Sequence, residues 1–206
     1  MVPFNVIESE GSIYTITTEG QLHVEDRPDA RPLIDALENT PIAAKPSKDM
    51  QAVQWGKLIL NLNNGLNALS GLPLVEQLSD PVWRRVLAAC IDEALTIARA
   101  EGITPAQIGK VKPAIIPKVL RLPTWLFRIL ASNMMKIDPS ARSSMSDDLT
   151  MGRQPEIDFL NGKIVALAKS HNIDVPVNSR VLAAVHELFA SPRDNRNRPS
   201  PQSILH

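Results

Sequence analysis

The sequence has little of several residue types, and each shortage excludes a class of protein. Its 206 residues include one cysteine, Cys90, so no intrachain disulfide can form and a reducing compartment is indicated. The charges cancel, with 22 Lys and Arg against 22 Asp and Glu, which argues against a nucleic-acid or anionic-membrane partner. No apolar run reaches the roughly 18 residues of a membrane span, and the first five residues lack a leader pattern. We therefore expect a cytoplasmic protein.

The patterns of glycine and histidine exclude the commonest cofactor and metal motifs. None of the nine glycines lie two positions apart, so the G-x-G-x-x-G fingerprint of dinucleotide-binding folds is absent. The four histidines have no metal-ligand spacing, and no Ser/His/Asp, H-E-x-x-H or phosphate-loop pattern occurs. We therefore predict no metal site. Seventeen prolines, against nine glycines, predict short elements with sharp ends.

The first 26 residues predict a small β-sheet. Runs of apolar, β-branched and aromatic residues over 2–7, 12–18 and 21–24 are separated by Ser-Glu-Gly and Glu-Gly turns. This pattern predicts three short strands in a meander that ends near Asp26. Three short strands bury little apolar area alone, so we expect the sheet to be covered or to be the remnant of a larger one.

From Asp29 onward the pattern is helical. Capping residues and apolar spacing predict helices over 29–38, from an N-cap at Ser47 to about Ser70, over 81–102, over 123–134, from Pro155 to about Leu167, and over 178–189. Prolines exclude long helices between 103 and 118, while 138–152 is predicted to be a loop and 191–206 a disordered tail. The predicted fold class is mainly α, a multi-helix domain behind a short N-terminal β-meander.

Four asparagines fall between Asn61 and Asn67, inside an otherwise apolar helix. At about 100° per residue, Lys57, Asn61 and Asn64 share one narrow arc, while an apolar arc that includes Trp55 and Leu62 faces elsewhere. A solvated polar face is one interpretation. The other is a pocket for a small oxygen-rich ligand, because amides beside a lysine offer donors and acceptors at fixed points.

A second polar stretch runs from Ser143 to Asp158. It contains Ser-Ser-Met-Ser-Asp-Asp and then Arg-Gln-Pro-Glu-Ile-Asp, which places hydroxyls and carboxylates near a predicted helix start. Acidic residues there also suit the helix dipole, so this pattern alone is weak. Elsewhere, Cys90 is expected to be an inert buried thiol, and the three tryptophans, Trp55, Trp83 and Trp125, are expected to be core residues.

The two stretches together resemble the ketopantoate reductase (2-dehydropantoate 2-reductase) family. Trp-Gly-Lys-Leu-Ile-Leu-Asn over 55–61 resembles its lysine–asparagine helix, and Ser144-Met145, Glu156-Ile157-Asp158, Asn161-Gly162 and Pro176-Val177-Asn178 resemble its second signature in the right order. The resemblance implies a fold like the 6-phosphogluconate-dehydrogenase-like C-terminal domain. It makes 1–28 remnant strands of a dinucleotide-binding domain and 29–190 a helical substrate and dimerisation domain.

The resemblance also implies roles for single residues. The reaction would be the NADPH-dependent reduction of a 2-oxo acid, 2-dehydropantoate or a similar acid, to the 2-hydroxy acid, in pantothenate synthesis for the type enzyme. Lys57 would be the general acid, Asn61, Asn64 and Ser144 would bind the substrate, and Glu156 would contact the ribose side of NADP(H). Asn64 stands one position before the family's usual asparagine, where this chain has Gly65.

Two departures from the family leave alternatives open. The glycine fingerprint and the family's catalytic asparagine before the last strands are both missing, so the chain is expected to be a truncated reading frame, a fragment, or half of a split reductase with a separate dinucleotide-binding chain. The different-class alternative is a non-catalytic helical binding or assembly module. Unpaired strand edges and apolar faces over 13–24 predict a homo-oligomer with the meander at one contact.

Overall fold

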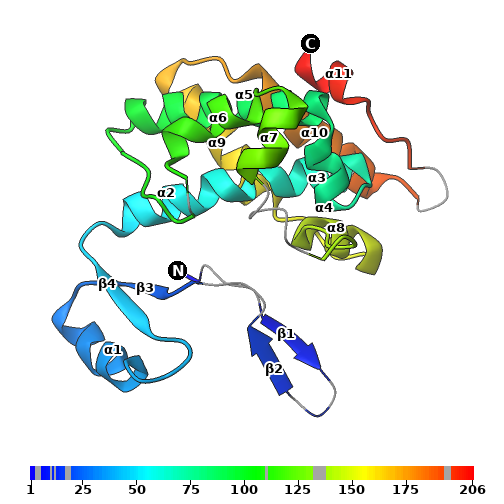
Figure 1. Cartoon of the computed structure of the whole chain (residues 1–206). Coiled ribbons are helices and arrows are strands. Elements are labelled where there is room, and N and C mark those ends of the chain that lie inside the picture. The colour runs from blue at the N-terminus through cyan, green and yellow to red at the C-terminus, as the bar shows by residue number, and fades with distance from the viewer. Residues whose placement is uncertain are drawn as a thin grey trace.

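The computed structural model describes residues 1–2, 6–9, 11, 13–16, 20–109, 111–131, 138–192 and 196–206. The architecture is mainly α, as predicted, with a body of helices above two small β-elements (Figure 1). None of the helices in these ranges is long and apolar enough to cross a membrane.

The strands do not form the predicted meander. β1 (Val6–Ser9) and β2 (Ile13–Ile16) make an antiparallel hairpin, but β3 (Leu22–Glu25) pairs in parallel with β4 (Ala44–Ser47) in a second sheet. The crossover between β3 and β4 carries η1 (Pro28–Ala30) and α1 (Arg31–Leu37). The three predicted strands are present, but their pairing as one meander was wrong, because β3 pairs in parallel with β4 beyond a crossover connection. Figure 1 shows the hairpin projecting away from the helices.

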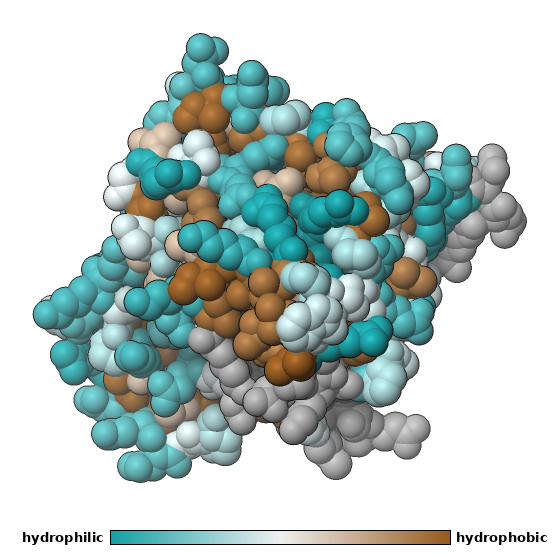
Figure 2. Space-filling view, turned by 45° about the horizontal axis from the view of Figure 1, so that its top comes forward, coloured by the Kyte–Doolittle hydropathy of each residue, from teal (hydrophilic) through white to brown (hydrophobic). Residues whose placement is uncertain are grey.

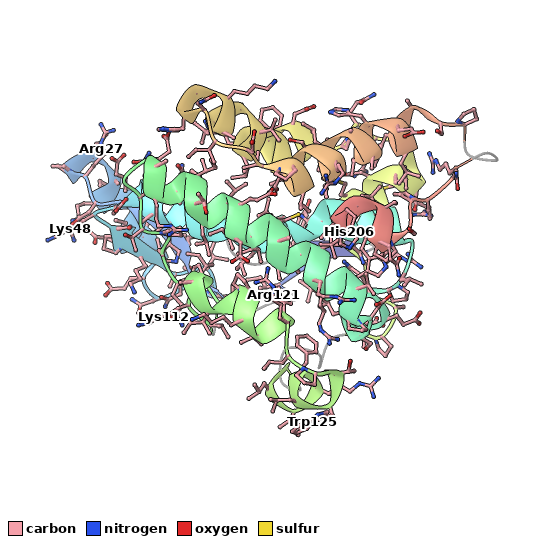
Figure 3. All side chains as sticks on the ribbon, turned by 90° about the horizontal axis from the view of Figure 1, so that it is seen from above. Arg27, Lys48, Lys112, Arg121, Trp125 and His206 are labelled. Atoms are coloured by element: carbon pink, nitrogen blue, oxygen red, sulfur yellow. The ribbon has the colours of Figure 1, made fainter. Side chains whose placement is uncertain are left out.

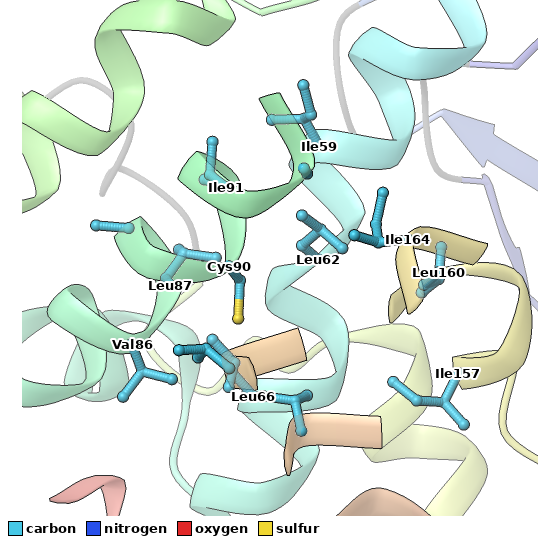
Figure 4. Close-up of a cluster of buried hydrophobic side chains, with 14 of the residues drawn as sticks. Ile59, Leu62, Leu66, Val86, Leu87, Cys90, Ile91, Ile157, Leu160 and Ile164 are labelled. Atoms are coloured by element: carbon cyan, nitrogen blue, oxygen red, sulfur yellow. The ribbon is translucent and has the colours of Figure 1, made fainter. Parts of the chain in front are cut away.

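The helical body surrounds one long central helix, α5 (Pro81–Ala100), of which ten residues are buried. The other helical elements are α2 (Met50–Asn61), α3 (Asn63–Ser70), α4 (Leu74–Ser79), η2 (Pro113–Ile115), α6 (Ile116–Leu120), α7 (Thr124–Ala131), α8 (Ser144–Met151), η3 (Ile157–Phe159), α9 (Asn161–His171), α10 (Pro176–Ala190) and α11 (Pro201–Leu205). Helices α6, α9, α10 and α11 all pack on α5. In the core between them Cys90 is fully buried, as predicted (Figure 4).

Local capping chemistry sets the ends of the helices around the site. The carboxylate of Asp80 accepts a hydrogen bond from the Val82 N–H at 2.7 Å, and Pro81 opens α5, as the sequence predicts. Gly71 ends α3 in the left-handed conformation (φ +67°). The cap of α2 is Asp49, whose Oδ1 accepts from the Ala52 N–H at 2.8 Å, so the predicted Ser47 cap was wrong.

Three segments fold differently from their predictions. The predicted loop 138–152 contains α8, capped by Ser143, whose side chain accepts from the Ser146 N–H. No continuous helix starts at Pro155: the short helix η3 comes first, and α9 begins only at Asn161. The predicted disordered tail contains α11, and its Ile204 is 2% exposed in the core.

The tryptophans divide between core and surface. Trp55 and Trp83 are buried, as predicted, but Trp125 is 66% exposed and the core prediction for it was wrong. Trp125 lies on α7 at the rim of the molecule (Figure 3). Ile129 and Leu130 of the same helix are also exposed, and Figure 2 shows hydrophobic side chains gathered on the face where α7 lies. Of the helix predicted over 123–134, residues 132–134 lie outside the described residues.

Candidate functional site

The predicted Lys–Asn row lies on two successive helices. Lys57 and Asn61 are one turn apart on α2, and Asn64 lies in the first turn of α3, because α2 ends at Asn61 and Leu62 separates the two helices. The opposite arc faces the core as predicted: Trp55, Ile59, Leu62, Leu66 and Leu69 are buried. Burial of that apolar arc leaves the three polar side chains on a separate, half-buried face.

Lys57 occupies an environment that disfavours its charge. The residue is half-buried, and burial lowers the pKa of its ammonium. Among the described residues, no hydrogen bond or ion pair compensates this charge. An ammonium with a lowered pKa gives up its proton more readily than an exposed lysine, which is the property required of a general acid near neutral pH.

Asn64 and Ser144 meet across 80 residues of sequence. The Asn64 Nδ2 lies 3.5 Å from the Ser144 Oγ, at the limit of a hydrogen bond, and the Ser143 Oγ donates to the Asn64 carbonyl oxygen at 3.1 Å. The two predicted substrate-binding residues therefore lie side by side where α3 packs on α8. Ser144 is exposed and Asn64 half-buried, so an amide and a hydroxyl are both open to a ligand.

A buried cluster of amides holds this junction, and the sequence did not predict it. The Asn67 Oδ1 accepts a hydrogen bond from the Ser143 N–H at 2.8 Å, and the Asn67 Nδ2 donates to the Gln77 Oε1 at 2.9 Å and the Leu72 carbonyl at 3.0 Å. The Gln77 Nε2 donates onward to the Asn63 Oδ1 at 2.9 Å. Asn67 and Gln77 are fully buried. The density of asparagines after position 61 was the available indication, but it did not separate this cluster from the polar row.

Glu156 lies on a turn that packs against α3 rather than on the helices that carry the row. It directly precedes η3, is exposed, and makes no hydrogen bond or ion pair to Lys57 or Asn61 within the described residues. Its neighbour Ile157 is fully buried against α3, where a Cβ added to Gly65 would stand 2.9 Å from the Ile157 Cδ1. The close approach that Gly65 permits therefore brings the turn carrying Glu156 against α3.

Other candidate chemistry in the described ranges is sparse. No three His, Cys, Asp or Glu side chains there gather as a metal site. Burial raises the pKa of the Cys90 thiol, so this cysteine is a core residue. A pocket of about 280 Å³ lies between the end of α8 and the end of α10. Its lining is Leu149, Gly152, Arg153, Gln154, Pro155, His186, Phe189, Ala190 and Arg196, none of which is a predicted site residue.

Sequence comparison identifies relatives over most of the chain. Residues 49–189 match the family model described as "Ketopantoate reductase PanE/ApbA C terminal". A 2-dehydropantoate 2-reductase from Halobacterium salinarum is 28% identical over 141 residues, which make up 67% of this chain and 39% of that protein. Another from Caulobacter vibrioides is 27% identical over 148 residues, 72% of this chain and 45% of that protein. The chain thus spans less than half the length of these two curated relatives.

Solved structures show the same fold. A PanE/ApbA family ketopantoate reductase from Ralstonia eutropha matches with a TM-score of 0.70 and 25% identity, over 90% of this chain and 57% of that one. A dimeric ketopantoate reductase from Staphylococcus aureus gives 0.68 at 19% identity, over 91% and 59%. D-mandelate dehydrogenase with NADH and anilino(oxo)acetate gives 0.65 at 20% identity, over 89% and 72%. The last two likenesses concern the fold alone.

Proposed function

Because the chain belongs to the ketopantoate reductase PanE/ApbA family through its C-terminal domain, we propose that it supplies the substrate side of a reductase active site. The reaction is the reduction of a 2-oxo acid, 2-dehydropantoate or a similar acid, to the 2-hydroxy acid. Residues 29–190 form the helical substrate domain in this proposal. The observation that carries it is the half-buried Lys57, which lies one helical turn from Asn61 and forms no ion pair with the described residues.

Lys57 is the general acid. NADPH, when bound, supplies the hydride to the ketone carbon. As negative charge grows on the carbonyl oxygen, an ammonium next to it stabilises that charge and then donates its proton. The lowered pKa of Lys57 supports this role, because an ammonium with a lower pKa is a stronger acid and donates its proton at a smaller cost in free energy.

The amides and the hydroxyl orient the acid. Asn61, Asn64 and Ser144 offer donors and acceptors to the carboxylate or hydroxyl groups of the substrate. The 3.5 Å approach of Asn64 to Ser144 supports their acting together on one ligand. Glu156 would accept hydrogen bonds from the ribose hydroxyls of a bound NADP(H), which its exposed carboxylate permits.

Titration with pantoate, the 2-hydroxy acid product, tests the substrate site directly. Saturable shifts of the Asn61, Asn64 and Ser144 amide resonances are expected in the wild-type chain, and weaker binding in Lys57→Met. Lys163→Met on the exposed face of α9 is the matched control. In a reductase that contains this domain, Lys57→Met should lower turnover by about 10²–10⁴-fold, the usual contribution of a general acid. Unchanged turnover would exclude the role.

A non-catalytic binding or assembly module is the second candidate. The observation that favours it is the absence of a G-x-G-x-x-G motif from the sequence. Titration of the purified chain with NADPH separates the two candidates. Micromolar binding would contradict the non-catalytic module, whereas no binding together with pantoate binding would favour a substrate domain that works with a separate dinucleotide-binding chain.

We also propose that the chain forms a homo-oligomer. Exposed apolar side chains on β1 and β2, such as Tyr14 and Ile16, favour association through the hairpin. Light scattering at micromolar concentration gives the mass, and a value of 22.6 kDa would contradict the proposal. Deleting 1–26 should weaken the association, while an unchanged oligomer would place the contact on the helices.

A further inference from the structure

Two guanidinium groups meet at the C-terminal end of α3. The Arg142 Nη1 donates a hydrogen bond to the Gly71 carbonyl oxygen at 2.8 Å. Arg198 lies over the same glycine, because a Cβ added to Gly71 would stand 2.8 Å from the Arg198 Cζ. The Arg198 Nη1 also donates to the carbonyl oxygens of Ala68 and Leu69. Two positive charges from segments more than 50 residues apart in the sequence therefore converge on one residue.

A third arginine adds to this charge, and no acid in the described part of the chain forms an ion pair with the three. Partial burial and the charges of Arg142 and Arg196 lower the pKa of Arg198, so each of these two arginines lies within electrostatic reach of Arg198. No carboxylate of the described residues forms an ion pair with any of them. Arg121, by contrast, pairs with Asp92 at 2.6 Å. Within the described ranges, the positive charge of the cluster is therefore not paired with a carboxylate.

The three side chains keep unused hydrogen-bond donors. A guanidinium has five N–H groups, and Arg142 and Arg198 each donate to the described residues through Nη1 alone. Both are exposed. Arg196 donates through Nη1 to the Leu149 carbonyl at 3.2 Å, while its Nε is buried without a partner. The C-terminal end of a helix carries a partial negative charge equivalent to about half an elementary charge. Neutralising that end therefore does not account for three arginine side chains.

We propose that Arg142 and Arg198 bind a doubly charged oxyanion of the phosphate class at Gly71, with the positive charge of Arg196 adding to the attraction. Several acceptor oxygens and two negative charges match two guanidinium forks better than a single carboxylate does. The ligand is a free phosphate ion or the phosphate group of an ester. This site is independent of the proposed reductase function, because none of its residues belongs to the row of Lys57 or to the turn of Glu156.

Titration of the whole chain with inorganic phosphate tests the site, by ³¹P NMR or calorimetry in chloride buffer at constant ionic strength. Saturable binding with a Kd below about 10 mM is expected, with a matching rise in Tm. Arg142→Gln and Arg198→Gln should each weaken binding by about tenfold or more, a loss of about 1.4 kcal/mol. Arg85→Gln, at an exposed position of α5, removes the same charge and should leave binding unchanged.

A second variant and a second ligand allow the proposal to be tested even if one variant does not fold. Arg142 donates one hydrogen bond from an exposed side chain, so Arg142→Gln carries the test if Arg198→Gln does not fold. Glycerol 3-phosphate binding more tightly than inorganic phosphate would identify an ester as the ligand, and equal binding would identify the free ion. Absence of saturation, or equal affinity in wild type and Arg142→Gln, would overturn the proposal and leave these arginines as caps of α3.

Discussion

The side-chain oxygen of Asn67 accepts a hydrogen bond from the backbone N–H of Ser143, 76 residues further along the chain, at 2.8 Å. Both residues are buried, so no water competes for either group. The bond fixes the start of α8 against α3. It thereby sets the position of Ser144, the next residue, relative to Asn64 on α3.

Replacing Asn67 should destabilise the fold. Asn67→Leu keeps the volume but leaves the Ser143 N–H, the Gln77 side chain and the Leu72 carbonyl without this partner, and each unsatisfied buried group costs about 1–3 kcal/mol. We expect urea denaturation to show a loss of about 3 kcal/mol or more in the free energy of unfolding. Asn197→Leu, at an exposed position, is the control and should change it little. An equal effect of both variants would contradict the structural role of Asn67.

Arg84 joins α5 to the segments that precede and follow it. It is fully buried, and its nitrogens donate five hydrogen bonds, to the carbonyls of Leu78, Ser79, Leu120 and Leu122 and to the Thr124 Oγ1, at 3.0–3.2 Å. Its Cζ also lies 4.4 Å from the centre of the Phe127 ring.

Lysine lacks the planar guanidinium group, so its ammonium cannot donate to all five acceptors. Arg84→Lys should therefore lower the free energy of unfolding by at least about 2 kcal/mol. Thermal or chemical denaturation measures this loss. Arg85→Lys, at the exposed neighbouring position, should leave stability nearly unchanged. Similar stabilities for the two variants would show that the Arg84 contacts contribute little.

Gly56 permits the close approach of two backbones beside Lys57. A Cβ at this position would stand 2.2 Å from the Ala106 carbonyl oxygen, and the Ala106 N–H donates to the Ala52 carbonyl at 2.8 Å. Alanine in a helix is favoured over glycine by about 1 kcal/mol, but the clash is with backbone, which cannot turn away.

We therefore expect Gly56→Ala to lower stability by about 1–3 kcal/mol or more. The measurement is the shift of the thermal unfolding midpoint. Gly109→Ala is the control, because its added Cβ would meet only the Leu60 Cδ1, at 3.9 Å. A raised midpoint for Gly56→Ala would mean that the segment after Ile103 yields to the new methyl group.

The pKa of Lys57 predicts a pH-dependent stability. Burial lowers this pKa in the folded state below its ordinary value of 10.5. Between the two values the unfolded chain binds more protons, so stability rises with pH in that window. Below the folded-state pKa the whole penalty is present, and Lys57→Met should therefore be more stable than wild type at neutral pH.

The advantage of Lys57→Met should shrink as the pH approaches 10.5. Denaturation curves of both proteins between neutral pH and that value provide the measurement. Lys163→Met, on the exposed side of α9, should follow the wild type throughout. A lysine whose removal destabilises the protein at neutral pH would contradict the desolvated environment of Lys57.

Periodicity and capping predicted the elements whose stability is decided locally. The apolar arc that includes Leu62 and Leu66 is buried as its spacing indicates, and Asp80 and Gly71 mark a helix start and a helix end. Helix α8 was missed because its sequence, Ser-Met-Ser-Asp-Asp, is polar, and its tertiary bond to Asn67 was not visible in the sequence. β4 was missed because it contains Pro46 and pairs only across a helical crossover.

Some features of the candidate site could be predicted from the sequence and others could not. The one-turn spacing of Lys57 and Asn61 follows from helix geometry alone. The meeting of Asn64 with Ser144 depends on the packing of α3 on α8, so local pattern did not reveal it and only the family resemblance paired them. The buried Asn67 was not assigned a role because asparagines are mostly exposed in proteins, and the sequence alone does not reveal the partners that allow this one to be buried.

Because the helix is interrupted at Leu62, different parts of the structure set the two spacings within the row of Lys57, Asn61 and Asn64. The spacing of Lys57 and Asn61 is enforced by the internal hydrogen bonds of α2, and a substitution elsewhere leaves it almost untouched. The spacing of Asn61 and Asn64 depends instead on how α3 is held by distant segments. Substitutions near Gln77 or Ser143 can thus adjust the distance between the two amides and, under the proposed function, the size of acid that would fit, while the lysine stays in place. Catalysis and selectivity would then evolve on separate parts of the chain.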